Sequence, residues 1–190
     1  MRISLNLVGI LIVVAVCGFV SLHAQEALTV YFVDVEGGQA TLVVSPSGQS
    51  LLIDSGFPGE RDARRIAAAA EDAGVDQIDY HMVTHLHADH LGSTPMLVSK
   101  MPILNYVDIG TPTEPNSRSS SAYDAYASVR ENGNHIIARA GDQIPVQGLD
   151  VQIVIAGGTV LSQPLPGAGE PNPLCRGYNP LPPDESEDAR

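Results

Sequence analysis

The sequence predicts an α/β protein with a mixed β-sheet and helices packed outside it. Two observations lead to this class. Three short segments of β type follow one another with tight connections, which is typical of an antiparallel meander. Segments of helical and β type then alternate along the chain, as expected when helices cover a sheet.

The meander is expected at residues 28–36, 39–45 and 50–54. The first segment is rich in β-branched and aromatic residues, and a Gly-Gly pair ends it. A Pro-Ser-Gly-Gln turn separates the second segment from the third. These breaks predict three separate strands rather than one long one.

A helix is expected at residues 60–73, which are dense in good helix formers. Apolar residues recur at helical spacing from Ile66 to Ala73, and Gly74 stands where a helix would end. The remaining elements are expected as strands at 80–84, 103–109, 143–146 and 150–156, a strand beginning near His135, and helices at 93–100 and 121–132.

The first 24 residues have the features of a secretory signal peptide. Arg2 is followed by an apolar run at 5–22, and Ala24 provides a small residue at the exit. An uncleaved membrane anchor is the alternative, because an apolar run of about 18 residues can span a bilayer. No positive cluster follows the run, which favours cleavage. We therefore expect a secreted or periplasmic protein without a stable membrane anchor.

The rest of the chain is expected to form one domain at residues 25–162 and a loop or tail at 163–190. The tail is acidic and contains seven prolines between Pro164 and Pro183. Without the leader the chain carries nine basic and 22 acidic residues, a net charge of −13. A field of that sign repels nucleic acid, so the charge does not support a nucleic-acid partner.

The strongest chemical signal is the segment Thr84-His-Leu-His-Ala-Asp-His-Leu-Gly92, directly after an expected strand. Neutral imidazoles and a carboxylate suit Zn²⁺, and also Fe or Mn. His85 and His87 lie two residues apart, so in an extended segment they point the same way and can bind one ion. Asp89 and His90 follow where the chain turns and can face a second ion. Four ligand-type residues within six positions argue against a chance polar cluster.

These four residues resemble the metal motif of the metallo-β-lactamase-fold hydrolases. The segments FVDVEGGQA at 32–40 and LIDSG at 52–56 resemble the opening strands of one branch, which includes the competence proteins of DNA internalisation. The resemblance covers roughly residues 28–156. It implies an αββα sandwich, of which this chain would be the N-terminal half.

The resemblance also implies roles for individual residues. His85 and His87 would bind a first metal, and Asp89 and His90 a second, with zinc expected as one or two ions. Asp89 would also orient the attacking water and so act as the catalytic residue. Two interpretations of Asp54 remain open: it braces the ligand loop from behind the metal ligands, or it caps the turn before Ser55-Gly56.

The sequence departs from the family pattern after His90. Complete members carry a later Gly-Asp, whose aspartate bridges both metals, and a later histidine. Here His135 is the only later histidine, and we interpret it as a structural or surface residue; Gly141-Asp142 is interpreted as a turn. We therefore expect an incomplete fragment whose uncovered sheet face forms an apolar patch.

Other polar and aromatic residues are interpreted as structural. His81 lies within an expected strand and is predicted to pack in the core rather than bind metal. Tyr106, Tyr123 and Tyr126 are expected to pack in the core or at its rim rather than line a substrate groove.

Two functions are compatible with these features. The first is an exported metal-dependent hydrolase, in which metal-activated water attacks an ester, amide or phosphodiester bond of a small-molecule or phosphodiester substrate. The second is a non-catalytic secreted metal-binding or interaction module, which the missing bridging aspartate favours. The sequence predicts neither the substrate nor the oligomeric state.

Overall fold

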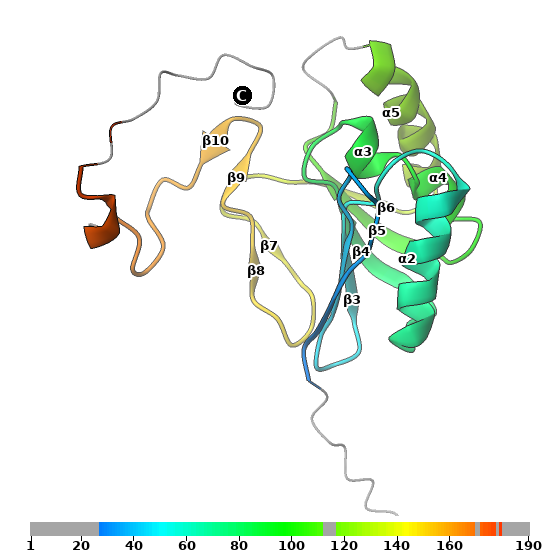
Figure 1. Ribbon diagram of the computed structural model, residues 1–190, viewed down its shortest axis with the longest axis horizontal. Helices are drawn as coiled ribbons and strands as arrows, with labels where there is room; N and C mark the ends of the chain where they lie inside the picture. The colour runs from blue at the N-terminus through cyan, green and yellow to red at the C-terminus, as the bar shows by residue number, and fades with distance from the viewer. Residues whose placement is uncertain (1–26, 112–116, 170–171, 178, 180–190) are drawn as a thin grey trace, which may run out of the picture.

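A mixed six-stranded sheet forms the centre of the fold in the order β1-β2-β3-β4-β5-β6 (Figure 1). The computed structural model describes residues 27–111, 117–169, 172–177 and 179. The signal peptide expected at 1–24 lies outside these residues, and so does most of the acidic end of the expected tail. None of the described helices is long and apolar enough to cross a membrane.

The first three strands pair antiparallel, as the meander predicted, and the later pairs are parallel. The carboxyl ends of the parallel strands therefore meet at one edge of the sheet. The strands are β1 (Thr29–Phe32), β2 (Thr41–Val44), β3 (Ser50–Ile53), β4 (Ile78–Met82), β5 (Ile103–Asp108) and β6 (Asn134–Ile137).

All the longer helical segments cover one face of this sheet (Figure 1). The expected helix at 60–73 is confirmed: it buries Ile66 and Ala70 against the sheet. Gly74 follows its C-terminal end, and a φ of 70° at this glycine lets the Val75 N–H reach the Ala70 carbonyl at 2.8 Å. The helices are α2 (Glu60–Asp72), α3 (Ala88–Leu91), α4 (Thr94–Leu97) and α5 (Ser117–Arg130).

A β-hairpin covers part of the opposite face, where Ile144 and Val146 are buried against Leu51 and Val107. The sheet face expected to be uncovered is therefore covered in part, although Phe32 on β1 is 84% exposed. This part of the chain contains β7 (Gln143–Ile144), β8 (Val151–Gln152), β9 (Ile155–Ala156), β10 (Thr159–Val160) and the short helix η2 (Pro173–Cys175).

Two expected strands have different bounds in the structure. The strand expected at 80–84 ends at Met82, because the Thr84 N–H donates to the Asp54 carboxylate instead of a neighbouring strand. The strand expected at 150–156 is split between β8 and β9, which belong to different hairpins. The split follows from the Gly157-Gly158 turn, where two positive φ angles fold β9 back onto β10.

Two expected helices also have different bounds. The helix expected at 93–100 is limited to Thr94–Leu97, and the helix expected at 121–132 begins earlier, at Ser117. Helix ends are set by capping and packing as much as by residue propensity, so composition places them only approximately.

Candidate metal centre

The metal motif lies at the sheet edge where the parallel strands end. Asp54 follows β3, and His85 follows two residues after Val83, whose N–H still bonds to Val107 on β5. The chain then bends through residues 84–87 into α3, which begins at Ala88. The topology therefore brings a carboxylate from one strand end beside the histidine loop of the next.

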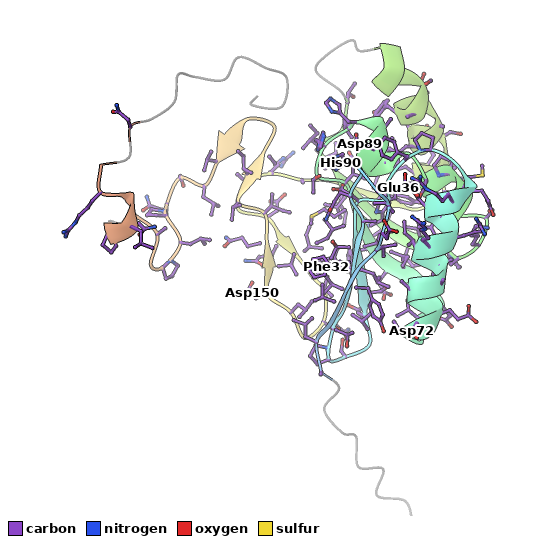
Figure 2. The ribbon with its side chains drawn as sticks, viewed as in Figure 1. Phe32, Glu36, Asp72, Asp89, His90 and Asp150 are labelled. Carbon is purple, nitrogen blue, oxygen red and sulfur yellow. The ribbon has the colours of Figure 1, made fainter. Side chains whose placement is uncertain are left out.

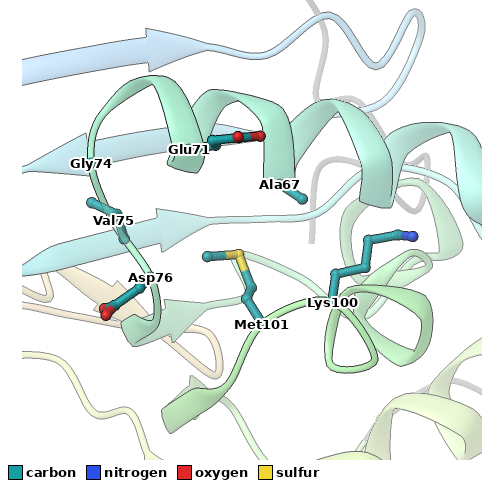
Figure 3. A pocket seen from close by; sticks show the side chains of 7 residues that line it. All are labelled: Ala67, Glu71, Gly74, Val75, Asp76, Lys100 and Met101. Atoms are coloured by element: carbon teal, nitrogen blue, oxygen red, sulfur yellow. The ribbon is translucent and has the colours of Figure 1, made fainter.

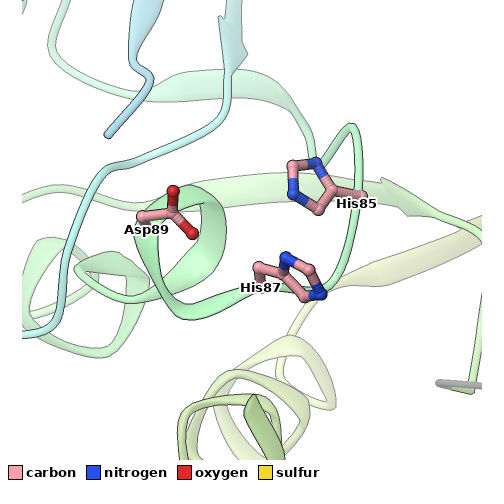
Figure 4. A group of neighbouring side chains, drawn as sticks. All are labelled: His85, His87 and Asp89. Atoms are coloured by element: carbon pink, nitrogen blue, oxygen red, sulfur yellow. The ribbon is translucent and has the colours of Figure 1, made fainter. Parts of the chain in front are cut away.

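His85, His87 and Asp89 form one group whose potential ligand atoms all lie within 4.8 Å of one another. Figure 4 shows the two imidazoles on the loop and the carboxylate on the first turn of α3. All three side chains are half-buried. Two imidazoles and one carboxylate are a donor set that fits a divalent metal such as zinc.

His90 lies directly beside this group. Its Nδ1 is 2.8 Å from Asp54 Oδ2, and its Nε2 is 3.5 Å from Asp89 Oδ2. Its ring centroid is 3.7 Å from that of His85. Since Nδ1 is occupied by Asp54, Nε2 is the nitrogen left to face Asp89. The structure thus brings together all four residues that the motif singled out (Figure 2 labels Asp89 and His90).

Asp54 is fully buried and accepts three hydrogen bonds from the ligand loop. Oδ1 accepts from the Thr84 N–H at 2.7 Å, and Oδ2 accepts from Thr84 Oγ1 at 2.7 Å as well as from His90. Its backbone has a φ of 58°, which is uncommon for a residue other than glycine. These contacts are the ones required of a residue that braces the loop.

Backbone contacts from the β1–β2 loop hold the turn that carries Asp89. The Gln39 N–H donates to the Asp89 carbonyl at 3.1 Å. A Cβ added at Gly38 would lie 2.6 Å from the same carbonyl oxygen, so only glycine allows this approach. Sequence reasoning interpreted Gly38 only as a strand break, although a glycine beside a strand end is also a signal of close backbone contact.

The two neighbouring histidines have different proton affinities. Burial lowers the pKa of His85, and the nearby His90 and His87 lower it further. Burial also opposes the charged form of His90, but its hydrogen bond to Asp54 and the charges of Asp54 and Asp89 outweigh burial and raise its pKa. The ring of His85 is therefore neutral at neutral pH, as metal binding requires.

His135 and Asp142, which follow the metal motif in the sequence, make contacts away from the grouped ligands. His135 Nε2 is 3.0 Å from Asp108 Oδ1, and the Arg139 N–H donates to Asp142 Oδ2 at 2.8 Å, within a turn. Within the part of the chain that the structure describes, no further His, Cys, Asp or Glu joins His85, His87 and Asp89.

His81 is fully buried in β4, as predicted. Tyr106 and Tyr126 are also buried core residues, and Tyr123 packs against the same core. A surface recess lies between the C-terminal end of α2 and the segment after α4 (Figure 3). Glu71, Asp76 and Lys100 line it, at the opposite edge of the sheet from His85, so it is not part of the metal site.

Comparison with known families identifies the fold family. The sequence model of the metallo-beta-lactamase superfamily matches residues 33–172, which is most of the chain. The chain belongs to the metallo-beta-lactamase superfamily. This confirms the family resemblance, whereas the branch of competence proteins stays a prediction.

Solved structures of metallo-beta-lactamases are also similar to this chain. Rm3 metallo-beta-lactamase has a TM-score of 0.47 at 21% identity, over 65% of this chain and 47% of that one. MEM-A1, a subclass B3 metallo-beta-lactamase from a soil metagenome library, has 0.43 at 20%, over 65% and 48%. A metallo-beta-lactamase family protein from Thermus thermophilus has 0.45 at 14%, over 69% and 54%.

This chain therefore spans about half the length of the solved metallo-beta-lactamases that it matches. No curated protein matches the sequence. Members of the superfamily are generally hydrolytic metalloenzymes that bind divalent metals, and the His-His-Asp group is a possible metal site of this kind.

Proposed function

We propose that this protein is an exported zinc-dependent hydrolase of the metallo-beta-lactamase superfamily. The observation that carries the proposal is the convergence of His85, His87 and Asp89 within 4.8 Å at the sheet edge. His90 would complete the site with its free Nε2, for one or two ions. Fe or Mn would fit the same mixture of nitrogen and oxygen donors.

The proposed chemistry is hydrolysis of an ester, amide or phosphodiester bond. A divalent ion held by these residues supplies Lewis acidity and lowers the pKa of water toward neutrality. The Asp89 carboxylate, on the first turn of α3, would accept a hydrogen bond from the attacking water and so orient it. Asp54 and Thr84 would hold His90 in one orientation through the hydrogen bonds described above.

Export and substrate class are further parts of the proposal. The apolar leader at residues 1–24 supports a secreted or periplasmic location. The net charge of −12 favours a small molecule over nucleic acid as the substrate. A small phosphodiester is compatible with this charge.

The first test measures zinc content and hydrolysis together. The purified protein without the leader at residues 1–24 is expected to bind zinc and to hydrolyse at least one chromogenic ester, β-lactam or phosphodiester, with activity lost on chelation and restored by zinc. His87→Ala should abolish both binding and hydrolysis, because it removes one of three grouped donors. His135→Ala is the matched control: it removes a half-buried histidine outside the group and should leave zinc binding intact. Hydrolysis that survives both chelation and His87→Ala would refute the proposal.

A non-catalytic metal-binding module is the second candidate. It is favoured by the small donor set, since the described residues bring only three grouped ligands and His90 to the site. This function predicts zinc binding that depends on His87 without hydrolysis of any substrate class. The same experiment therefore separates the two functions.

A further inference from the structure

His81 is an unusual residue for the middle of a buried strand. It lies on β4, between β3 and β5, and its side chain is fully buried. Its ring packs edge-on against Tyr106 and Tyr126, with centroids 6.2 Å away in both cases. Burying a polar ring costs free energy unless its nitrogens are hydrogen-bonded, so the partners of His81 are informative.

Both ring nitrogens of His81 have hydrogen-bond partners, and these partners determine which nitrogen carries the proton. Nδ1 lies 3.4 Å from the Leu52 carbonyl oxygen, and Nε2 lies 2.9 Å from Thr94 Oγ1. Burial lowers the pKa of His81, so the ring is neutral. A carbonyl can only accept, so Nδ1 carries the proton and Nε2 accepts from the Thr94 hydroxyl.

The hydrogen bonds continue from Thr94 toward the metal motif. Thr94 Oγ1 is 3.0 Å from Ser55 Oγ, and both side chains are fully buried. With its own proton given to His81, the Thr94 oxygen can only accept. The single Ser55 hydroxyl proton is therefore shared between Thr94 Oγ1 and the His90 carbonyl oxygen, which lies 3.2 Å from Ser55 Oγ. Ser55 in turn contacts α3 and the residue before α4. Its N–H donates to the His90 carbonyl of α3 at 2.6 Å, and the Ser93 hydroxyl, directly before α4, donates to the Ser55 carbonyl at 2.5 Å.

This chain of contacts therefore connects the central strand to the turn that carries Asp89 and His90. The neutral imidazole accepts only at Nε2, so it fixes the direction of the Thr94 hydroxyl and makes Thr94 Oγ1 an acceptor for Ser55. The His90 carbonyl, at the other end, is within two bonds of the Cα that carries the His90 ring. A small displacement of Ser55 would therefore displace a ligand side chain directly.

We propose that His81 and Thr94 are positioning residues, which act through Ser55 to place Asp89 and His90 for metal binding. The proposal deepens the proposed function and rests on it for the metal. Neither residue touches the grouped ligands His85, His87 and Asp89 through a described hydrogen bond. An apolar residue at position 94 would remove one of the two acceptors of the Ser55 hydroxyl and leave only the His90 carbonyl. An apolar residue at position 81 would leave the Thr94 hydroxyl without its acceptor and free it to rotate against Ser55.

The test compares Thr94→Val, which keeps the shape and removes the hydroxyl, with Thr94→Ser, which keeps the hydroxyl. Zinc affinity is measured by competition with a chromogenic chelator, and the site geometry by the visible spectrum of the Co²⁺-loaded chain. Thr94→Val is expected to weaken zinc binding by roughly 10–100-fold and to change the Co²⁺ spectrum. Thr94→Ser should restore both.

Two additions separate positioning from general destabilisation. Ser50→Ala removes another fully buried hydroxyl, bonded to the Gln77 carbonyl at 2.9 Å at the far end of β3, and should leave the Co²⁺ spectrum unchanged. His81→Leu should reproduce the effect of Thr94→Val, and the double variant should lose no more than either single variant. Zinc affinity unaffected by Thr94→Val, or lowered equally by Ser50→Ala, would overturn the proposal.

A metal-free readout keeps this inference distinct from the proposed function. The Ser55 amide donates to His90, so its hydrogen exchange reports on that contact. Thr94→Val should accelerate exchange at Ser55 by at least about tenfold more than Ser50→Ala does. If the unmodified chain binds no metal, the proposed function fails, while this comparison still decides whether His81 and Thr94 hold the turn. Equal exchange at Ser55 in the two variants would overturn the positioning role.

Discussion

Single side chains hold the ligand loop in place, and Asp54 is the one with the most contacts to it. Its carboxylate accepts from the Thr84 backbone, the Thr84 hydroxyl and the His90 ring. Because a carboxylate can only accept, it forces Nδ1 of His90 to carry the proton and leaves Nε2 free as a donor of electrons to a metal. One residue thereby controls both the orientation and the tautomer of a ligand.

Asp54→Asn is expected to weaken zinc binding by roughly 10–100-fold. The new amide N–H₂ would face His90 Nδ1 and move the ring proton to Nε2, where it would compete with the metal. Asparagine tolerates the positive φ of this position, so the backbone should keep its conformation. Chelator competition measures the affinity, and Asp79→Asn, which changes an aspartate bonded to Ser50 at the other sheet edge, is the control. Equal affinities in the parent and Asp54→Asn would contradict this role.

At the scale of elements, the site depends on close packing between the β1–β2 loop and α3. The loop donates Gln39 N–H to the Asp89 carbonyl, and Gly38 lies against that same carbonyl. Gly92 follows the C-terminal end of α3 and lies against Pro58, so a side chain at this position would also clash. The turn is therefore held on both sides by backbone that has no room for a Cβ.

Gly38→Ala is expected to lower the free energy of unfolding by about 1–3 kcal/mol, because the added methyl overpacks against backbone. It should also weaken zinc binding, since the displaced group is the backbone of Asp89. Gly37→Ala is a matched control, because nothing lies within 4 Å of its added Cβ. Urea unfolding and zinc competition measure the two effects. A Gly38→Ala chain as stable as Gly37→Ala would show that the loop adjusts freely.

A second polar cluster fastens α5 to the sheet. Asp108 is buried at the end of β5 and accepts from Tyr126 at 2.6 Å, Arg130 at 2.8 Å and His135 at 3.0 Å. Burial raises the pKa of Asp108, but these hydrogen bonds outweigh burial and hold the pKa below its ordinary value. Since α5 also contacts α3, the cluster supports the helical layer beside the site.

Asp108→Asn should lower the free energy of unfolding by about 3–5 kcal/mol, because Arg130 loses the charge that compensates its burial. The native pKa of Asp108 is depressed, so its contribution is present above the unfolded pKa and is lost as pH falls through the folded pKa. The variant should therefore lose less stability than the parent on acidification. Urea unfolding at several pH values tests this, with Asp124→Asn, exposed on the same helix, as the control. Identical acid dependence in parent and Asp108→Asn would contradict the assignment.

At the scale of the whole molecule, the net charge opposes association between copies of the chain, whereas the exposed apolar residues of the second sheet face favour it. The chain carries a charge of −12 at pH 7, which keeps copies apart. The hairpin β7–β8 covers the middle of the second face, but Phe32 and Val30 on the edge strand β1 remain exposed. An exposed apolar edge strand is a site where chains associate when repulsion is reduced.

Association is therefore expected to increase with salt and toward the isoelectric point near pH 4.6. Phe32→Thr should reduce this association without lowering the free energy of unfolding by more than about 0.5 kcal/mol, because the ring is 84% exposed and threonine suits a strand. Leu174→Thr, at an apolar residue outside the sheet that is 92% exposed, should leave association unchanged. Light scattering measures the difference, and equal scattering from all three chains would argue against β1 as the contact.

The fold class and the four motif residues were predictable because they depend on local signals. Alternating residue types indicate strands, helix formers followed by Gly74 indicate α2, and the spacing of His85, His87, Asp89 and His90 indicates metal binding. The family was also identified from these residues, and the family match confirms it. Each of these signals lies within a few residues of sequence.

The contacts behind the site required the tertiary structure. Asp54 lies 36 residues from His90, and the sequence left its role divided between bracing and turn capping. The links from Gly38 to Asp89 and from His81 through Thr94 to Ser55 join β-strands and turns that are distant in sequence. Such contacts depend on strand order and register, which pair groups through space. Local residue patterns do not encode those distances, so only the folded chain determines which polar groups hold the ligands.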